Sequence, residues 1–97
     1  QAEAYQCTEA KHQADKLKIT LAFGTGTLKN DKGAGGMSVF ISERYWNRLD
    51  FAEKSAFADS LVCAVAGPGK GLVRMQLRSD MTGKTVGEWS TGKLTVP

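Results

Sequence analysis

Residues 42–69 decide the fold, and they read SERYWNRLDFAEKSAFADSLVCAVAGPG. From Tyr45 to Ala66 the apolar side chains recur every three or four residues, which places them on one face of a helix. Gly67 and Pro68 end the pattern, because glycine accepts the left-handed conformation of a helix cap and proline cannot continue a helix. The stretch therefore predicts a long helix with one buried face.

Asp50 and Glu53 divide this stretch in two. They match the reciprocal capping pattern, in which each side chain accepts a hydrogen bond from the backbone amide of the other residue. Ser42 is a second cap, since its hydroxyl accepts from the free amide hydrogens of the next turn. We expect a short helical turn over 43–49, kinked into a longer helix over 51–66.

The segments on either side of the helix alternate apolar and polar side chains, as half-buried strands do. Strands are predicted over residues 16–23, 37–41, 73–77 and 85–89, with a short last strand over 94–96. A tight turn is predicted over 80–83, with glycine at the left-handed position. Gly87 marks a bulge, because Val86 and Trp89 otherwise point to opposite faces of their strand.

Residues 24–36 hold five glycines in thirteen positions. So many glycines make any fixed conformation costly in entropy, so a long mobile loop is predicted, with Leu28 as its one sizeable apolar anchor. Residues 1–15 form a polar N-terminal segment. Its weakly apolar members at positions 7, 10 and 14 suit a short helix.

This layout predicts an α+β domain. It consists of a single antiparallel β-sheet of about four to five strands with one main helix packed on one face, in the order (α)ββαββ(β). Leu17, Ile19 and Leu21 are expected to face that helix from the first strand. The 97 residues form one domain over 1–97, too short for a two-domain dinucleotide-binding enzyme. No apolar run approaches the ~18 residues that a membrane-spanning helix needs.

Cys7 and Cys63 are the two cysteines of the chain. The sequence begins at Gln1 without an initiator methionine, as chains do after a signal peptide has been removed. We therefore expect an exported protein, secreted or periplasmic, in which the two cysteines form a disulfide. Two cysteines are too few and too far apart in sequence for a zinc site of four clustered ligands, so no metal is expected.

Three features that resemble catalytic motifs have simpler interpretations. Residues 83–85 read Gly-Lys-Thr, but they lack the earlier glycine and the following helix of a phosphate-binding loop. His12, the only histidine, lies in a polar segment and is expected at the surface. Asp59 could suggest a carboxylate for acid–base catalysis. It falls on the polar side of the main helix, so a structural role is expected. We expect a non-enzymatic protein that needs no cofactor.

The chain is mildly basic, with a net charge of +3 and no run of like charges. The first hypothesis is a small exported binding or accessory protein that acts through a protein partner. The alternative is a small basic module that binds nucleic acid or another polyanion through the outer face of the sheet. Lys16, Lys18, Arg74 and Arg78 are expected to project from that face. Salt separates the two, because polyanion binding weakens steeply with ionic strength.

Overall fold

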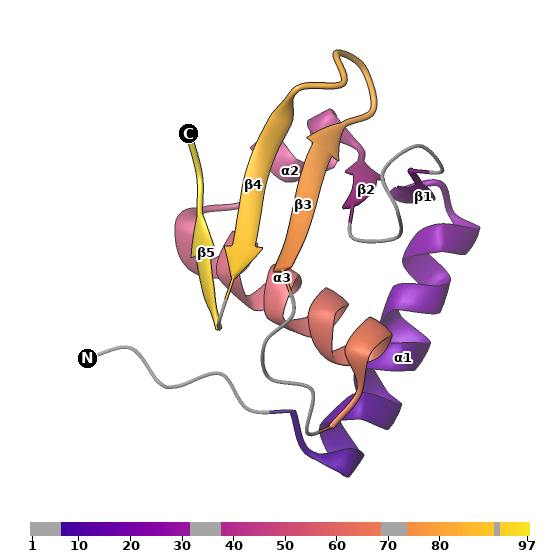
Figure 1. Ribbon diagram of the computed structural model, residues 1–97. Helices are drawn as coiled ribbons and strands as arrows, with labels where there is room; N and C mark the ends of the chain where they lie inside the picture. Colours follow the sequence, from indigo (N-terminus) through magenta and orange to yellow (C-terminus); the bar gives the residue numbers. More distant parts are fainter. Residues whose placement is uncertain (1–6, 32–37, 69–73, 91) are drawn as a thin grey trace.

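A computed structural model describes residues 7–31, 38–68, 74–90 and 92–97 (Figure 1). The helices are α1 (Glu9–Gly24), α2 (Glu43–Asn47) and α3 (Phe51–Ala66). The strands are β1 (Leu28–Asn30), β2 (Ser38–Ile41), β3 (Arg74–Ser79), β4 (Thr85–Ser90) and β5 (Lys93–Thr95). Helices and one sheet are thus combined, and the predicted α+β class is confirmed.

The five strands form one sheet in the order β1-β2-β3-β4-β5. Neighbouring strands are antiparallel except β2 and β3, which run parallel with Val39 opposite Leu77. The prediction of a single antiparallel sheet is therefore wrong at this pair. The reason lies in the connection: α2 and α3 separate the two strands, and such a crossover returns the chain to the same end of the sheet.

Residues 16–23 are helical, although their alternation predicts a strand. They form the second half of the 16-residue helix α1, so the predicted element order is wrong at this point. Ile19 is buried at 3% exposure, whereas Leu17 and Leu21 are 72% and 69% exposed. The helix prevails because lysine, leucine and alanine are good helix formers and because α1 packs its Ile19 face against α3.

Helix α1 begins within the polar N-terminal segment, where the sequence predicts a short helix, and continues to Gly24. Thr8 is its cap, since its hydroxyl oxygen accepts a hydrogen bond of 3.1 Å from the backbone amide of Lys11. Glu9 lies in the first turn, where a negative charge is favourable to the helix dipole. A cap and a charge at one end thus support a helix four turns long.

Strand β1 lies in the glycine-rich segment 24–36, which was expected to be a loop throughout. Its Leu28 is only 1% exposed and faces Ile41 across the antiparallel pair with β2. One well-buried leucine is enough to fix three residues as an edge strand. The mobile loop was predicted over all of residues 24–36, and its part at residues 32–36 lies outside the described residues.

The division of residues 43–66 into two helices is confirmed. Ser42 caps α2 by accepting from the amide of Tyr45 at 3.3 Å. At the start of α3, the Glu53 amide donates to the Asp50 carboxylate at 2.8 Å and the Asp50 amide donates to the Glu53 carboxylate at 2.9 Å. Gly67 ends α3 with φ of +82°, a conformation that other residues rarely adopt.

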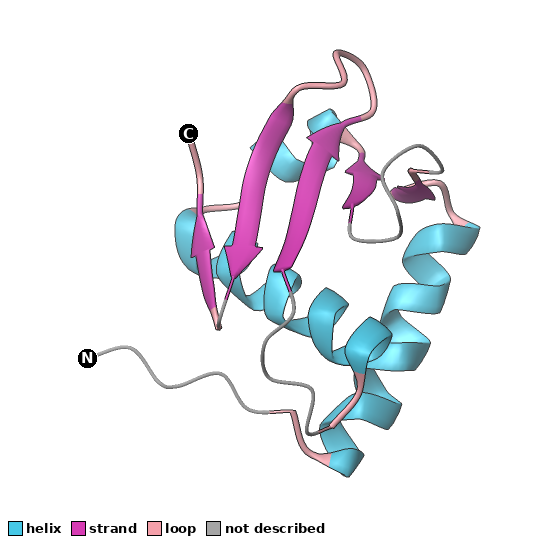
Figure 2. Cartoon of the chain, viewed as in Figure 1, coloured by secondary structure: helices cyan, strands magenta, loops and turns pink. Residues whose placement is uncertain are grey.

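The core lies between the sheet and helices α2 and α3, which pass behind β3 and β4 in Figure 2. Trp46, Phe57 and Leu61 come from the helices and are each at most 4% exposed. Leu77 and Trp89 come from the sheet and are fully buried. The predicted helix face is therefore confirmed. Residue 73, the first of the predicted strand 73–77, lies outside the described residues.

Gly87 lies where strand β4 packs most tightly on the core. A Cβ atom at this position would lie 3.0 Å from Cζ2 of Trp46 and 3.3 Å from Cδ1 of Leu94. Leu77 pairs with Gly87 but Arg78 pairs with Thr85, so Val86 is an extra residue in β4. The predicted bulge beside Gly87 is confirmed: Gly87 and Trp89 both face inward, and the extra residue Val86 is partly buried against the core.

Candidate functional site

The four basic residues predicted on one sheet face lie on two different elements. Arg74 and Arg78 alternate outward along β3, as the sequence predicts. Lys16 and Lys18 lie on helix α1 and are exposed there. The prediction of a shared basic face is therefore wrong for the two lysines, because residues 16–23 are not a strand.

Both arginines on the outer sheet face are paired with carboxylates. Arg74 reaches Glu88 on the neighbouring strand β4, with Nη2 at 2.6 Å from a carboxylate oxygen. Arg78 lies 3.0 Å from Asp31 through Nη1 and donates through Nε to the carbonyl of Gly83 at 2.8 Å. Much of the positive charge of the two arginines is thus neutralised by these partners.

Arg78 belongs to a network that fixes the outer side of the sheet near β1. Its guanidinium lies over the ring of Phe40, 5.6 Å from the ring centre. Asp31 also accepts a hydrogen bond of 3.0 Å from the hydroxyl of Ser38, and both residues are buried at under 10% exposure. The network joins the ends of β1 and β2 to β3, so we assign it a structural role.

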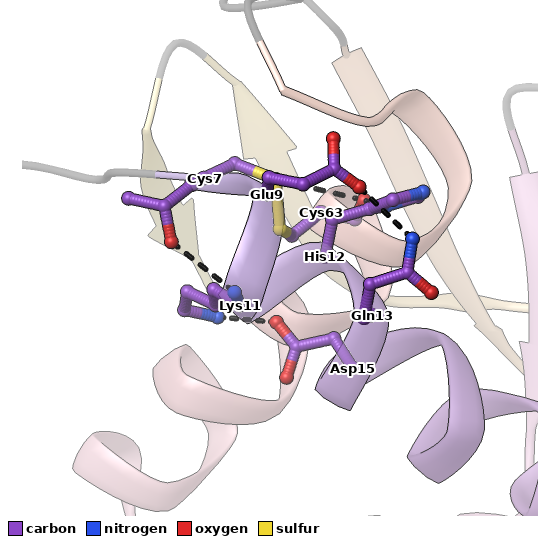
Figure 3. Close-up of a disulfide and its surroundings, with 8 residues drawn as sticks. Cys7, Glu9, Lys11, His12, Gln13, Asp15 and Cys63 are labelled. Atoms are coloured by element: carbon purple, nitrogen blue, oxygen red, sulfur yellow. Dashed lines mark hydrogen bonds and ion pairs between the residues drawn. A yellow bond between two sulfur atoms is a disulfide. The ribbon is translucent and has the colours of Figure 1, made fainter.

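The predicted disulfide between Cys7 and Cys63 is confirmed (Figure 3). Cys7 precedes α1 and is half-buried, whereas Cys63 lies in α3 and is fully buried. The bond closes a separation of 56 residues, which in the chain-entropy model stabilises the fold by about 4 kcal/mol. The disulfide therefore clamps the start of α1 to the end of α3.

His12 is half-buried and lies beside the disulfide, so it is only partly at the surface as the sequence predicts (Figure 3). Its Nδ1 lies 2.8 Å from the backbone carbonyl oxygen of Cys63. Because a carbonyl only accepts, Nδ1 carries the proton in this contact. His12, Cys7 and Cys63 place one ring nitrogen and two sulfurs within 4.8 Å of one another.

A second polar cluster lies further along the contact between α1 and α3. Lys11 and Asp15 form an ion pair one helical turn apart, and Asp15 is 8% exposed. On α3, Asp59 accepts a hydrogen bond from the indole of Trp89. Burial raises the pKa of Asp59 above its ordinary value, while the bond from Trp89 and the charge of Lys11 lower it by less.

The outward side of α1 carries a row of small and apolar residues, which we call the α1 seam. Its members are Ala10, Ala14, Leu17, Leu21 and Gly24, all of them exposed. Their separations are four, three, four and three residues, the repeat with which one helix packs along another. The sequence analysis does not predict this row, because a strand over residues 16–23 would place Leu17 and Leu21 in the core.

A hollow of about 350 Å³ opens between α1, α3 and the sheet. Its described lining is mainly apolar and includes Phe23, Val39, Val65 and Met75. Two of its polar residues, Asp31 and Ser38, are bonded to each other. Few polar groups therefore remain to orient a small ligand.

Among the described residues, no helix combines the length and the apolar character needed to cross a membrane. Fold and site thus define a class, a small α+β domain with a disulfide-clamped helix and an exposed α1 seam. Comparisons with protein-family models, curated proteins and solved structures gave no match.

Proposed function

We propose that this chain is a small, non-enzymatic binding protein whose partner is another protein, docked along the α1 seam. The observation that carries the proposal is the exposure of Leu17 and Leu21, at 72% and 69%, on a helix whose other face is already packed. Large apolar side chains at helical spacing on a surface are typical of an interface core.

The composition of the α1 seam favours a helical partner. Leu17 and Leu21 are flanked along the helix by Ala10, Ala14 and Gly24, whose small side chains let a second backbone approach closely. The two leucines then act as knobs that enter the partner's holes. A lipid surface is less well matched, because a membrane-binding helix buries a broad apolar face and this one offers only two large side chains.

The charge around the α1 seam favours an acidic partner. Lys16 and Lys18 lie on its two flanks, and neither forms an ion pair with another described residue. Aspartate or glutamate beside the apolar row of the partner would meet these lysines and fix its register. A second copy of this chain fits less well, since antiparallel pairing would bring like charges together.

The disulfide makes α1 a preformed binding surface. Cys7 holds the first turn of α1 to α3, and Ile19 anchors the second half in the core. A rigid surface loses little conformational entropy on binding, so more of the contact energy appears as affinity. Disulfides persist in oxidising compartments, which supports the proposal that the protein acts after export, in a secreted or periplasmic setting.

The alternative, a polyanion-binding module, has weaker support. It needs free cations on a shared face, whereas Arg74 pairs with Glu88 and Arg78 pairs with Asp31. Of the four predicted binding residues, only Lys16 and Lys18 lie outside the described ion pairs, and two cations attract a polyanion weakly.

Site-specific crosslinking in cells that produce the protein tests the proposal. A photoreactive residue at Thr20, which is exposed beside the α1 seam, should give a protein adduct. The adduct should be lost in the Leu17→Ala, Leu21→Ala double variant. It should persist in Met81→Ala, the matched control, which removes an equally exposed apolar side chain from the β3–β4 turn. An adduct that survives the double variant would place the partner elsewhere.

The purified variants then separate the two functions. Heparin and single-stranded DNA should bind wild-type protein weakly at low salt, with no change in Arg74→Ala. Tight low-salt binding that disappears in the Arg74→Ala, Arg78→Ala double variant would favour the polyanion module.

A further inference from the structure

Cys7, His12 and Cys63 bring together the ligand set of a soft metal ion, outside the surface that carries the proposed function. Their two sulfurs and one ring nitrogen all lie within 4.8 Å of one another. A tetrahedral zinc ion, with bonds of about 2.0–2.3 Å, holds its ligand atoms about 3.3–3.8 Å apart. Once the S–S bond is opened, the three ligand atoms therefore lie in the range of separations that one zinc ion requires.

We propose that the reduced chain binds one Zn²⁺ through the thiolates of Cys7 and Cys63 and the imidazole of His12. The disulfide and the zinc site are alternative states of the same three residues. A fourth position stays open to water, because Cys7 and His12 are only half-buried while Cys63 is fully buried. The site is independent of the partner at the α1 seam.

The two states interconvert by a balanced exchange. A dithiol reductant breaks the S–S bond and supplies two electrons and two protons, giving two thiols and one oxidised dithiol. Zinc binding then displaces the two thiol protons, because thiolate is the ligand form. In the reverse direction a disulfide oxidant takes two electrons from the thiolates, and its own S–S bond is cleaved to two thiolates, so the Cys7–Cys63 bond reforms and the ion is released.

The fold keeps the ligands close after reduction. Cys63 lies in α3 and is held by the core, while Cys7 is followed directly by the cap of α1. Ile19, at 3% exposure, continues to anchor α1 in the core. The contact of His12 with the carbonyl of Cys63 holds the imidazole beside the sulfurs, so little further ordering is needed when the ion arrives.

Metal titration of reduced and oxidised protein tests the proposal. The chain is reduced with a dithiol, freed of it without oxygen, and titrated with Co²⁺, a spectroscopic substitute for Zn²⁺. We expect one Co²⁺ per reduced chain, with the intense absorption of thiolate-bound tetrahedral cobalt, displaced by Zn²⁺. The oxidised chain should show neither. A reduced chain that binds Co²⁺ no better than the Cys7→Ser, Cys63→Ser double variant overturns the site.

His12 distinguishes a three-ligand site from simple chelation by two thiols. His12→Ala should weaken Zn²⁺ binding, measured against a competing chelator, by at least about tenfold. Gln13→Ala, the exposed neighbour on the same helix, should leave the affinity unchanged. Equal affinities in wild type and His12→Ala would remove the imidazole from the site and refute the proposal as stated.

Folding is followed in the same samples by far-ultraviolet circular dichroism. If reduction unfolds the chain, Zn²⁺ should restore the helical signal in wild type and not in the double cysteine variant. Failure of Zn²⁺ to restore it would contradict the proposal.

Discussion

Trp89 and Asp59 join strand β4 to helix α3, because the indole Nε1 donates a hydrogen bond of 2.6 Å to the carboxylate Oδ1. Trp89 is fully buried and Asp59 is half-buried, so water competes little for this bond. Burial raises the pKa of Asp59 above its ordinary value of 3.8. The oxygen of Asp59 therefore stabilises the fold, while its negative charge is unfavourable there.

Asp59→Asn separates these two effects, because it keeps an accepting oxygen and removes the charge. A raised folded-state pKa means that the contribution of Asp59 is fully present below the unfolded pKa and is lost as the pH rises through the folded pKa. Asparagine does not ionise, so Asp59→Asn does not lose this stability as the pH rises. Its unfolding free energy relative to wild type should rise between about pH 3 and about pH 7, measured by urea unfolding. A difference that stays constant with pH would contradict this.

Asp59→Ala is the companion variant, because it removes the charge and the oxygen together. Loss of the acceptor for a buried indole N–H should lower the unfolding free energy at neutral pH by about 1–3 kcal/mol. Equal stability of Asp59→Ala and Asp59→Asn would show that the bond to Trp89 contributes little.

Ile19 and Leu17 test the helical structure of residues 16–23. Ile19→Ala should cost about 2–4 kcal/mol of unfolding free energy, because the side chain is buried in the core. Leu17→Ala should change it by less than about 0.5 kcal/mol, because the side chain is mostly exposed. Urea unfolding of both variants decides between helix and strand. In a strand the two residues share one face, and the two costs would be similar.

Gly87→Ala should destabilise the fold by about 1–3 kcal/mol, because the added methyl group overpacks the core. Its Cβ would lie 3.0 Å from the ring of Trp46. Gly24→Ala is the matched control, since nothing lies within 4 Å of a Cβ added there. The midpoint of thermal unfolding should fall in the first variant and not in the second. A fall of equal size in both would attribute the effect to backbone conformation and not to packing.

Arg78 and Arg74 differ in the burial of the carboxylates with which they pair. Arg78→Ala should cost about 1–3 kcal/mol, because it takes a charged partner from the buried carboxylate of Asp31. Arg74→Ala should cost less than about 1 kcal/mol, because its ion pair with Glu88 is exposed to solvent. Urea unfolding at low and high salt measures both. Equal costs would mean that the network around Asp31 adds no stability.

Local signals in the sequence were enough to predict helices α2 and α3. Asp50 and Glu53 cap α3 through side chains that touch only residues nearby in sequence, and Gly67 ends it through its own backbone. The glycine at position 87 was also informative, because a bulge was the only way to turn both Val86 and Trp89 toward the core. Interactions of short range along the chain can thus be deduced without a structure.

Residues 16–23 show where such deduction fails. Leu17 and Leu21 satisfy a period of two, but they are also four residues apart, as on one face of a helix. The choice depends on the contact of Ile19 with the rest of the core, and that contact is distant in sequence. Lys16 and Lys18 belong to the same segment. They therefore lie on helix α1 and not on the outer sheet face, where the sequence predicted them.

The cluster of Cys7, His12 and Cys63 was predictable in part. An even number of cysteines indicated the bond between Cys7 and Cys63. The position of His12 beside it was not deduced, although the histidine follows Cys7 by only five residues in a segment with helical spacing. Recognising it required the start of α1 and the end of α3 to be placed side by side, which no local pattern shows.

The parallel pairing of β2 with β3 has a consequence for the order of folding. The β3–β4 hairpin closes through the short turn at 80–83 and needs only local contacts, which form quickly. Ile41 and Ser79 can meet only after the intervening chain has closed a long loop, whose entropy is lost before their contact forms. Folding should therefore be limited by the meeting of two locally formed halves, with α3 as the element that brings them together.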